Sequence, residues 1–96
     1  MRLGVRSMPQ SLTEILAQRG NSYGDYSEQA HLAQVLKECI RNSQSYPDML
    51  AVERESLEMI CTKLSRLLTG SPHHEDSWVD IAGYAQLVVN ALRRDT

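Results

Sequence analysis

The chain lacks several features that would assign it to a common class of protein. Its 96 residues include no phenylalanine, only three prolines and only two cysteines. No apolar run is long enough for a signal peptide or a membrane span. No segment alternates polar and apolar residues as a half-buried β-strand does. These absences argue against a disulfide-stabilised secreted domain, a membrane protein and a β-rich fold.

Charge of one sign is not concentrated either. The net charge is −2, and acidic and basic residues are spread along the chain. The local basic pairs, Arg2 with Arg6 and Arg93 with Arg94, lie near the two ends. Duplex DNA requires a basic surface that neutralises its phosphates, so we expect no duplex DNA partner.

The two cysteines, Cys39 and Cys61, each fall on an apolar helical stripe. This placement predicts two buried free thiols in a reducing compartment rather than a disulfide. We therefore expect a cytoplasmic protein that makes no contact with a membrane. Translation could start at Met1 or at Met8, and the sequence leaves both open.

What the chain does contain is helical periodicity. The apolar spacing predicts helices over residues 12–18, 27–41, 49–68 and 77–94. In a capping box, a side chain before the helix and one three residues later each bind the other residue's backbone N–H. The sequence predicts such boxes at Ser11 with Glu14, Asp25 with Glu28, and Ser77 with Asp80.

The fourth predicted helix is apolar on nearly all sides. A helix of this kind is buried on more than one side, so we expect it at the centre of the fold or in a subunit interface. The fold class that we predict is all-α, a compact helical bundle of about four helices with a central, nearly all-apolar C-terminal helix. Residues 1–10 form a flexible N-terminal segment and residues 11–96 a single helical domain, with the first helix as a lid or arm.

Four carboxylates flanking the junction of the third and fourth helices are candidate metal ligands: Glu55, Glu58, Asp76 and Asp80. The short junction makes the two helices antiparallel, which brings Asp76 and Asp80 towards Lys63 and Arg66. If the carboxylates converge, they suit Mg²⁺, a hard ion that prefers oxygen ligands. In the structural alternative, the aspartates cap the fourth helix and pair with Lys63 and Arg66.

Two loops are weaker candidates. The first loop is Tyr23 to Tyr26. Its backbone N–H groups before a helix can bind an anion, and its tyrosines can stack on a base. The same loop is equally typical of a turn with Asp25 as N-cap. In the second, His73 and His74 precede two acids, but the three or four ligands of a zinc site are not present at suitable spacing. We expect an exposed loop there.

Several short pieces between residues 16 and 92 occur together in this chain. They are Arg19-Gly20, Tyr23-Gly24-Asp25, residues Ala30 to Leu36, Glu58-Met-Ile-Cys-Thr-Lys-Leu-Ser-Arg66 and Asp76-Ser-Trp-Val-Asp-Ile-Ala-Gly-Tyr-Ala85. Taken together, they resemble a family of small uncharacterised proteins that are common in tailed-phage and prophage genomes. This resemblance implies a phage accessory protein with an all-α domain, located in the cytoplasm of the bacterial host.

The sequence is also similar, more weakly, to the all-α nucleotide pyrophosphatases of the MazG type and to nucleotide-modification-associated domains of phages. In those pyrophosphatases, two glutamates one turn apart and a Glu-x-x-Asp on a later helix hold Mg²⁺. Glu55 and Glu58 would stand for the first pair. Asp76 and Asp80 depart from the second in spacing and residue type, and the usual double-glutamate start is absent.

We therefore predict a non-enzymatic phage accessory protein that needs no cofactor. It would bind a host factor, such as a defence or nucleic-acid-processing protein, or a nucleotide ligand. We expect self-association, because the helices carry more apolar surface than one core requires. The residues that we assign to ligand or partner binding are Tyr23, Asp25, Lys63, Arg66 and Tyr84.

The alternative is a Mg²⁺-dependent, MazG-like nucleotide pyrophosphohydrolase acting on (d)NTPs. In that hypothesis the four carboxylates hold the metal, and Lys63 and Arg66 contact the phosphates. In a third hypothesis the charged residues are purely structural and the function lies on another surface.

Overall fold

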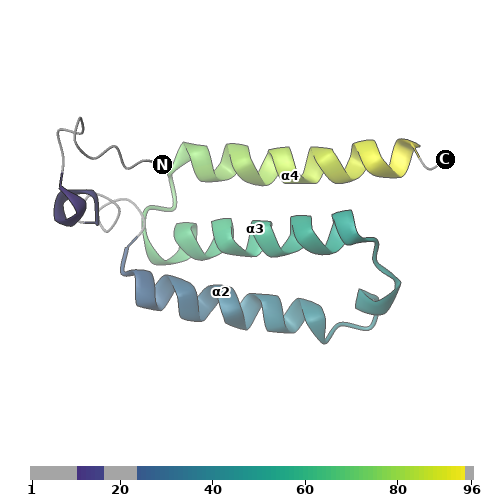
Figure 1. Cartoon of the computed structure of the whole chain (residues 1–96), viewed down its shortest axis with the longest axis horizontal. Helices are drawn as coiled ribbons and strands as arrows, with labels where there is room; N and C mark the ends of the chain where they lie inside the picture. The colour runs from purple at the N-terminus through teal and green to yellow at the C-terminus, as the bar shows by residue number, and fades with distance from the viewer. Residues whose placement is uncertain (1–10, 17–23, 95–96) are drawn as a thin grey trace.

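All regular elements in the described part of the chain are helices, which confirms the all-α prediction. A computed structural model describes residues 11–16 and 24–94. The elements are α2 (Tyr26–Arg41), the 3-10 turn η2 (Tyr46–Asp48), α3 (Ala51–Thr69) and α4 (Glu75–Arg94) (Figure 1). A short helical segment over residues 12–16 precedes them. The predicted flexible segment 1–10, Tyr23 and the end of the first predicted helix lie outside the described residues.

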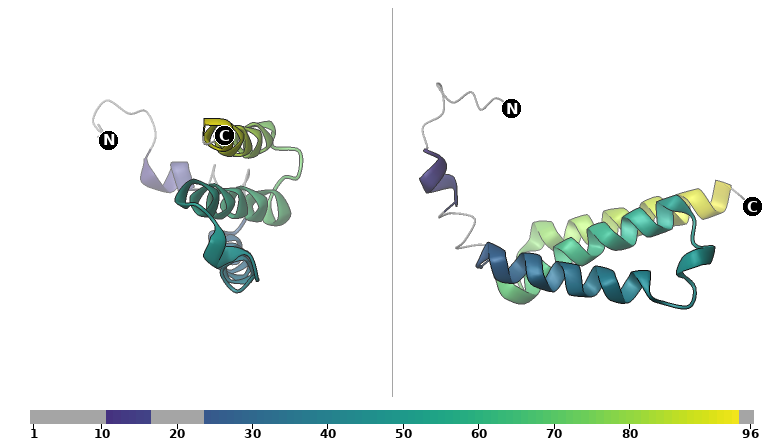
Figure 2. Two further views of the ribbon diagram at one scale, coloured as in Figure 1. Left: turned by 90° about the vertical axis from the view of Figure 1, so that its right-hand side faces the viewer. Right: turned by 60° about the horizontal axis from the view of Figure 1, so that its bottom comes forward.

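The three long helices lie side by side in one layer, with α3 in the middle. α3 packs against α2 on one side and against α4 on the other, and the end-on view in Figure 2 shows the three helices in a row. The prediction of a bundle of helices is confirmed, but the position predicted for the C-terminal helix is wrong. α4 forms one edge of the layer.

α3 lies in the middle because it carries buried residues, most of them small, on two opposite sides. Helical spacing puts Cys61 and Ser65 on the side of α2, and Ser56 and Leu67 on the side of α4. The neighbouring helices also have small buried residues: Ala33 on α2, and Ser77 and Ala91 on α4. Small side chains at both contacts let the helix axes approach closely, whereas an apolar helix surface alone does not decide which helix is central.

The capping box predicted at Ser11 with Glu14 is confirmed, and at the second helix start the predicted N-cap, Asp25, is confirmed without the reciprocal bond from Glu28. Ser11 N–H donates to Glu14 Oε1 at 2.8 Å, and Glu14 N–H donates to Ser11 Oγ at 3.2 Å. Asp25 is the N-cap of α2, where its Oδ1 accepts from the backbone N–H of Ser27 at 3.1 Å. These bonds satisfy N–H groups that have no partner inside the helix.

The third predicted capping box, at Ser77 with Asp80, is wrong. α4 begins at Glu75, two residues earlier than predicted, so Ser77 lies inside its first turn. The Ser77 side chain is buried, and its Oγ lies 2.9 Å from Nδ1 of His74. Asp80 is therefore too far along the helix to cap it, and its carboxylate is available for another contact.

Two loops hold the ends of α3. Before α3, Arg54 Nη2 donates to the carbonyls of Tyr46 and Pro47, both at 3.1 Å, and the guanidinium lies 4.5 Å from the Tyr46 ring centre. At the other end, Gly24 has a φ of 82° and lies directly against the Thr69 carbonyl, where a Cβ would clash. Only glycine meets both conditions easily, so Gly24 sets how α2 starts against the end of α3.

The short segment over residues 12–16 lies beyond the end of the layer at which α2 begins (Figure 1). Its Leu12 and Leu16 side chains are exposed. The segment thus extends from the layer as an arm and does not cover the long helices as a lid would.

Candidate functional site

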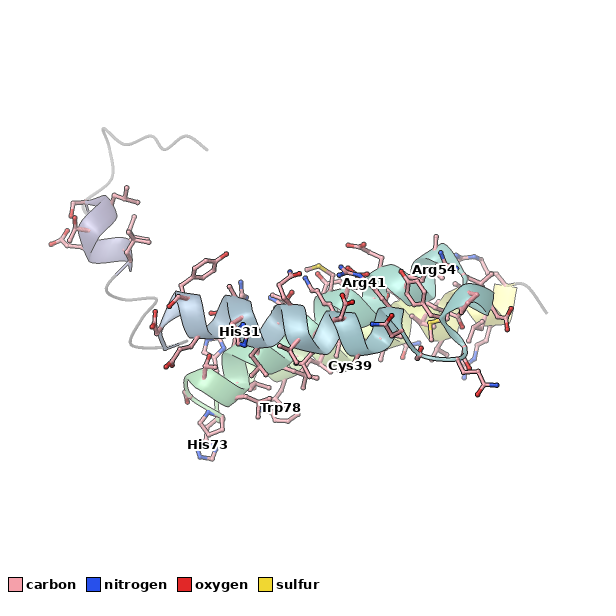
Figure 3. The ribbon with its side chains drawn as sticks, turned by 90° about the horizontal axis from the view of Figure 1, so that it is seen from below. His31, Cys39, Arg41, Arg54, His73 and Trp78 are labelled. Atoms are coloured by element: carbon pink, nitrogen blue, oxygen red, sulfur yellow. The ribbon has the colours of Figure 1, made fainter. Side chains whose placement is uncertain are left out.

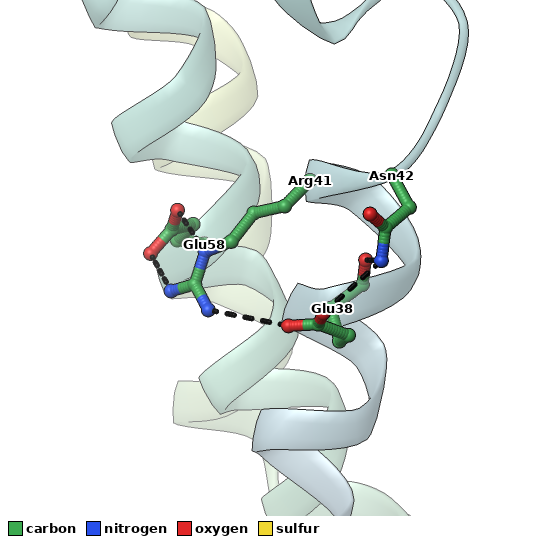
Figure 4. Close-up of polar contacts among 4 residues, drawn as sticks. All are labelled: Glu38, Arg41, Asn42 and Glu58. Carbon is green, nitrogen blue, oxygen red and sulfur yellow. Dashed lines mark hydrogen bonds and ion pairs between the residues drawn. The ribbon is translucent and has the colours of Figure 1, made fainter.

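Glu58, a candidate metal ligand, is held by Arg41 of α2. Arg41 Nη2 lies 3.0 Å from Glu58 Oε1, and Arg41 Nε lies 3.3 Å from Glu58 Oε2, a two-pronged contact between α2 and α3 (Figure 4). Glu38 on α2 adds a second carboxylate 4.0 Å from Arg41 Nη1. The hydrogen bond and the charge of Glu58 raise the pKa of Arg41 above its ordinary value. This pairing fastens α2 to α3.

Asp80, a second candidate ligand, is held by Lys63 across the α3–α4 contact. Lys63 Nζ lies 2.9 Å from Asp80 Oδ2. The Lys63 side chain is only 13% exposed, whereas that of Asp80 is 46% exposed. The expected approach of this aspartate to Lys63 is confirmed, and the contact pairs a largely buried lysine side chain with a half-exposed carboxylate.

The four candidate metal ligands are therefore not brought together. Glu58 of α3 faces α2, whereas Asp80 of α4 contacts Lys63 on the opposite side of α3. Glu55 and Asp76 are exposed. Across residues 11–16 and 24–94, no group of three or more His, Cys, Asp or Glu side chains is placed to hold a metal ion. Glu58 and Asp80 are separated because α3 lies between α2 and α4, and each carboxylate is held at a different one of these two contacts.

The remaining predicted ligand-binding residues do not form one site either. Asp25 uses its carboxylate to cap α2, at the end of the layer. Tyr84 is half-buried on α4, where it lines a shallow depression with Val79, Asp80, Gly83 and Leu87. Arg66 is half-buried one turn after Lys63 on α3. Lys63 and Tyr84 thus both lie beside Asp80 of α4, whereas Asp25 lies at the end of the layer.

The histidines are placed as an ordinary loop would place them. His73 is exposed, and the half-buried His74 lies against Ser77. The expectation of two buried thiols is only half right, because Cys61 is buried but Cys39 is exposed. Both cysteines are free, and burial raises the pKa of the Cys61 thiol.

One side of the layer is a broad apolar face, which the pattern of charged residues in the sequence does not indicate. In Figure 3, Cys39 and Trp78 lie towards one side of the layer, and Arg41 and Arg54 lie towards the other. Helical spacing brings the apolar stripes of all three helices to the first side. These stripes consist of Leu32, Val35, Leu36 and Cys39 on α2; Leu57, Ile60, Leu64 and Leu68 on α3; and Trp78, Ala82, Ala85, Val89 and Leu92 on α4.

Several large side chains of this apolar face are open to solvent. Leu68 is 67% exposed, Trp78 52% and Val35 44%. Between α3 and α4 the structure is hollowed into a groove of about 310 Å³, lined by Met49, Glu53, Ser56, Leu57, Ile60, Ala85 and Val88. The stripes were visible in the sequence as helical periods. What was not visible is that a single layer of helices leaves them uncovered.

The described residues form an open, all-α layer with a broad apolar face on one side and further exposed apolar residues, Val79 and Leu87 of α4, outside that face. Two ion pairs, Arg41–Glu58 and Lys63–Asp80, join its helices. The chain belongs to the family described as "Domain of unknown function (DUF6378)", whose model matches residues 8–91. No curated protein and no solved structure matches the chain. Within the described ranges, no helix is both long and apolar enough to cross a membrane.

Proposed function

We propose that this protein is a non-enzymatic phage accessory protein that acts by binding a partner protein through its apolar face. The observation that carries the proposal is the exposure of Val35, Leu68 and Trp78 on one continuous side of the layer. Exposing a large apolar surface to water is unfavourable in free energy. In soluble proteins, large exposed apolar patches mark interaction sites.

The contacts favour a protein partner over a nucleotide. The predicted nucleotide contacts include Asp25, whose carboxylate caps α2, and Lys63, whose ammonium group is held by Asp80. A phosphate would have to displace Asp80 from Lys63, whereas an apolar partner surface displaces only water from the exposed leucine and valine side chains. The resemblance to tailed-phage proteins over residues 16–92 supports a host factor as the partner.

The part of the face that we assign to the partner lies on α2 and α3. These helices are antiparallel, with the start of α2 beside the end of α3 (Figure 1). Leu68 therefore lies beside the first turn of α2, and Val35 lies further along the same side of the layer, near the middle of α2. Leu32 on α2 and Leu64 on α3 continue the same stripes. In this proposal an apolar helix of the partner packs along these two stripes.

The proposal is tested by recovering the partner and mapping where it binds. Tagged protein is incubated with bacterial lysate, and the co-purified protein is identified, purified and titrated by calorimetry. Val35→Glu with Leu68→Glu should abolish the complex, because two carboxylates cannot be buried in an apolar interface without cost. Glu55→Gln, an exposed change on the other side of α3, is the matched control and should bind as the wild type does.

The same titration is repeated with a chelator, which should make no difference. A partner that binds the double variant as tightly as the wild type would contradict the assignment of the apolar face. Tight nucleotide binding combined with no recoverable protein partner would contradict the proposal as a whole. Circular dichroism of each variant separates loss of binding from loss of the fold.

A further inference from the structure

The layer does not close a core by itself. Among the described residues, the buried apolar side chains are only Ala33, Cys61, Leu67 and Ala91. Helical domains bury their apolar faces between packed layers, and the long helices within residues 24–94 form one layer. The helical segment 12–16 spans about 7.5 Å and α4, with 20 residues, about 30 Å, so that segment cannot cover the face.

The α4 part of the apolar face has the spacing of a helix-pairing seam. Trp78, Ala82, Ala85, Val89 and Leu92 follow one another at steps of four, three, four and three residues, and all five are exposed. This heptad step is the one by which two helices interlock side chains along their length. From Ile81 to Leu92 the helix carries no charged residue. We call these five residues the α4 seam.

The charges at the two ends of α4 indicate whether a second α4 helix pairs with it in a parallel or an antiparallel orientation. Glu75 stands at the start and Arg93 near the end, and the 18 residues between them make five turns, so both lie on the same flank of the seam. An antiparallel second copy of α4 would place each Glu75 beside the Arg93 of the other copy. A parallel copy would put both Glu75 residues at one end and both Arg93 residues at the other, so neither charge would meet an opposite one across the seam.

We propose that a second copy of this chain covers the α4 seam, with the two α4 helices antiparallel about a two-fold axis. Ala82 and Ala85 lie at the axis, where small side chains let the helices approach closely, and Trp78 packs near Val89 of the other copy. This inference rests on the proposed function, because it takes the apolar face to be a binding surface. It assigns only the α4 edge to self-association and leaves Val35 and Leu68 to the partner protein.

The test is the mass and sedimentation of the purified full-length chain over a wide concentration range. The wild type should show twice the chain mass of 10.9 kDa and dissociate on dilution. Ala85→Glu should be monomeric at all concentrations, because it buries two carboxylates at the axis. Glu55→Gln, the exposed change on the other side of α3, is the control and is expected to dimerise as the wild type does. Val89→Lys is a second seam variant in case Ala85→Glu does not fold.

The orientation is tested by charge reversal. Glu75→Arg or Arg93→Glu alone should weaken dimerisation about tenfold, since two exposed pairs are lost in each dimer. The two changes together should restore the wild-type dissociation constant. Two single variants that leave dimerisation unchanged would overturn the antiparallel arrangement.

The sole tryptophan, Trp78, gives an independent signal from the seam. Its emission should shift to longer wavelength, and its quenching by iodide should increase, when the wild-type dimer is diluted. A wild type that is monomeric at every concentration overturns the inference, whether Trp78 is exposed or is shielded by other residues of the same chain. Partner capture that depends on Val35 and Leu68 would survive that result, so the two proposals fail separately.

Discussion

Lys63 Nζ on α3 lies 2.9 Å from Asp80 Oδ2 on α4, and the lysine side chain is almost enclosed. This contact decides how the acidic residues near the α3–α4 junction are used. It gives a charged partner to a lysine side chain that is largely buried between two helices, while the Asp80 carboxylate stays in contact with water. Asp80 therefore stabilises the contact between α3 and α4, and a ligand that bound Lys63 would have to displace Asp80.

The first prediction concerns this pair. Asp80→Asn should lower the free energy of unfolding by about 1 kcal/mol, because Lys63 keeps its enclosed position but loses its charged partner. Urea unfolding followed by circular dichroism measures the change. Glu55→Gln, in an exposed position, should stay within about 0.5 kcal/mol of the wild type. Equal stability of the wild type and Asp80→Asn would show that the ion pair is not formed in solution.

A second prediction concerns the pyrophosphohydrolase alternative. Glu58 of α3 and Asp80 of α4 lie on opposite sides of α3 and cannot hold one metal ion together. We therefore expect no phosphate or pyrophosphate release from a panel of canonical and modified dNTPs with Mg²⁺ or Mn²⁺. Asp80→Asn is assayed beside the wild type. Turnover by the wild type that is lost in the folded variant would make the carboxylates an active site and would reverse the conclusion drawn from their separation.

The third prediction concerns the contact of Arg41 with Glu58. Glu58→Gln should destabilise the protein at low salt, because the charge-assisted contact between α2 and α3 is replaced by a neutral one. The difference from the wild type should shrink as salt is added, since the pair is open to solvent on one side. Unfolding curves at a series of salt concentrations test this. A difference that does not change with salt would mean that packing, and not charge, is what the substitution removes.

The fourth prediction uses two glycines as a matched pair. Gly24→Ala should destabilise the fold by about 1–3 kcal/mol, because alanine is strained at positive φ and its Cβ meets the Thr69 carbonyl. Gly83→Ala should be neutral or stabilise by up to about 1 kcal/mol, since nothing lies near its Cβ position on α4. Urea unfolding measures both. Similar effects of the two substitutions would contradict the close approach at Gly24.

The fifth prediction separates the two thiols. A thiol reagent should label Cys39 rapidly and Cys61 only on unfolding, because Cys61 is buried and its raised pKa keeps it protonated. The folded thiol has the higher pKa, so its contribution to stability is present below the ordinary value of 9.0 and is lost as the pH rises through the raised value. Labelling followed by mass spectrometry distinguishes the sites. Rapid labelling of both thiols in the folded protein would contradict the packing around α3.

The local parts of the fold were predictable from the sequence. The capping box of Ser11 with Glu14 and the N-cap at Asp25 depend on residues within one turn of each other, so short-range patterns suffice to find them. The approach of Asp80 to Lys63 was also predictable, because a short loop forces antiparallel packing. The start of α4 was not, because Ser77 is a good N-cap residue whose side chain is buried against His74 instead.

The sequence by itself determined the helices, their order and the apolar stripe that each one carries, because these depend on residues a few positions apart. Only the tertiary structure decided that α3 lies in the middle, that Glu58 and Asp80 are kept apart, and that the apolar stripes line one open face. These outcomes depend on which sides of α3 carry residues small enough for a neighbouring helix to approach. Periodicity shows that a side of a helix is apolar, but the helix packed against it, or its absence, follows from contacts between residues far apart in the chain.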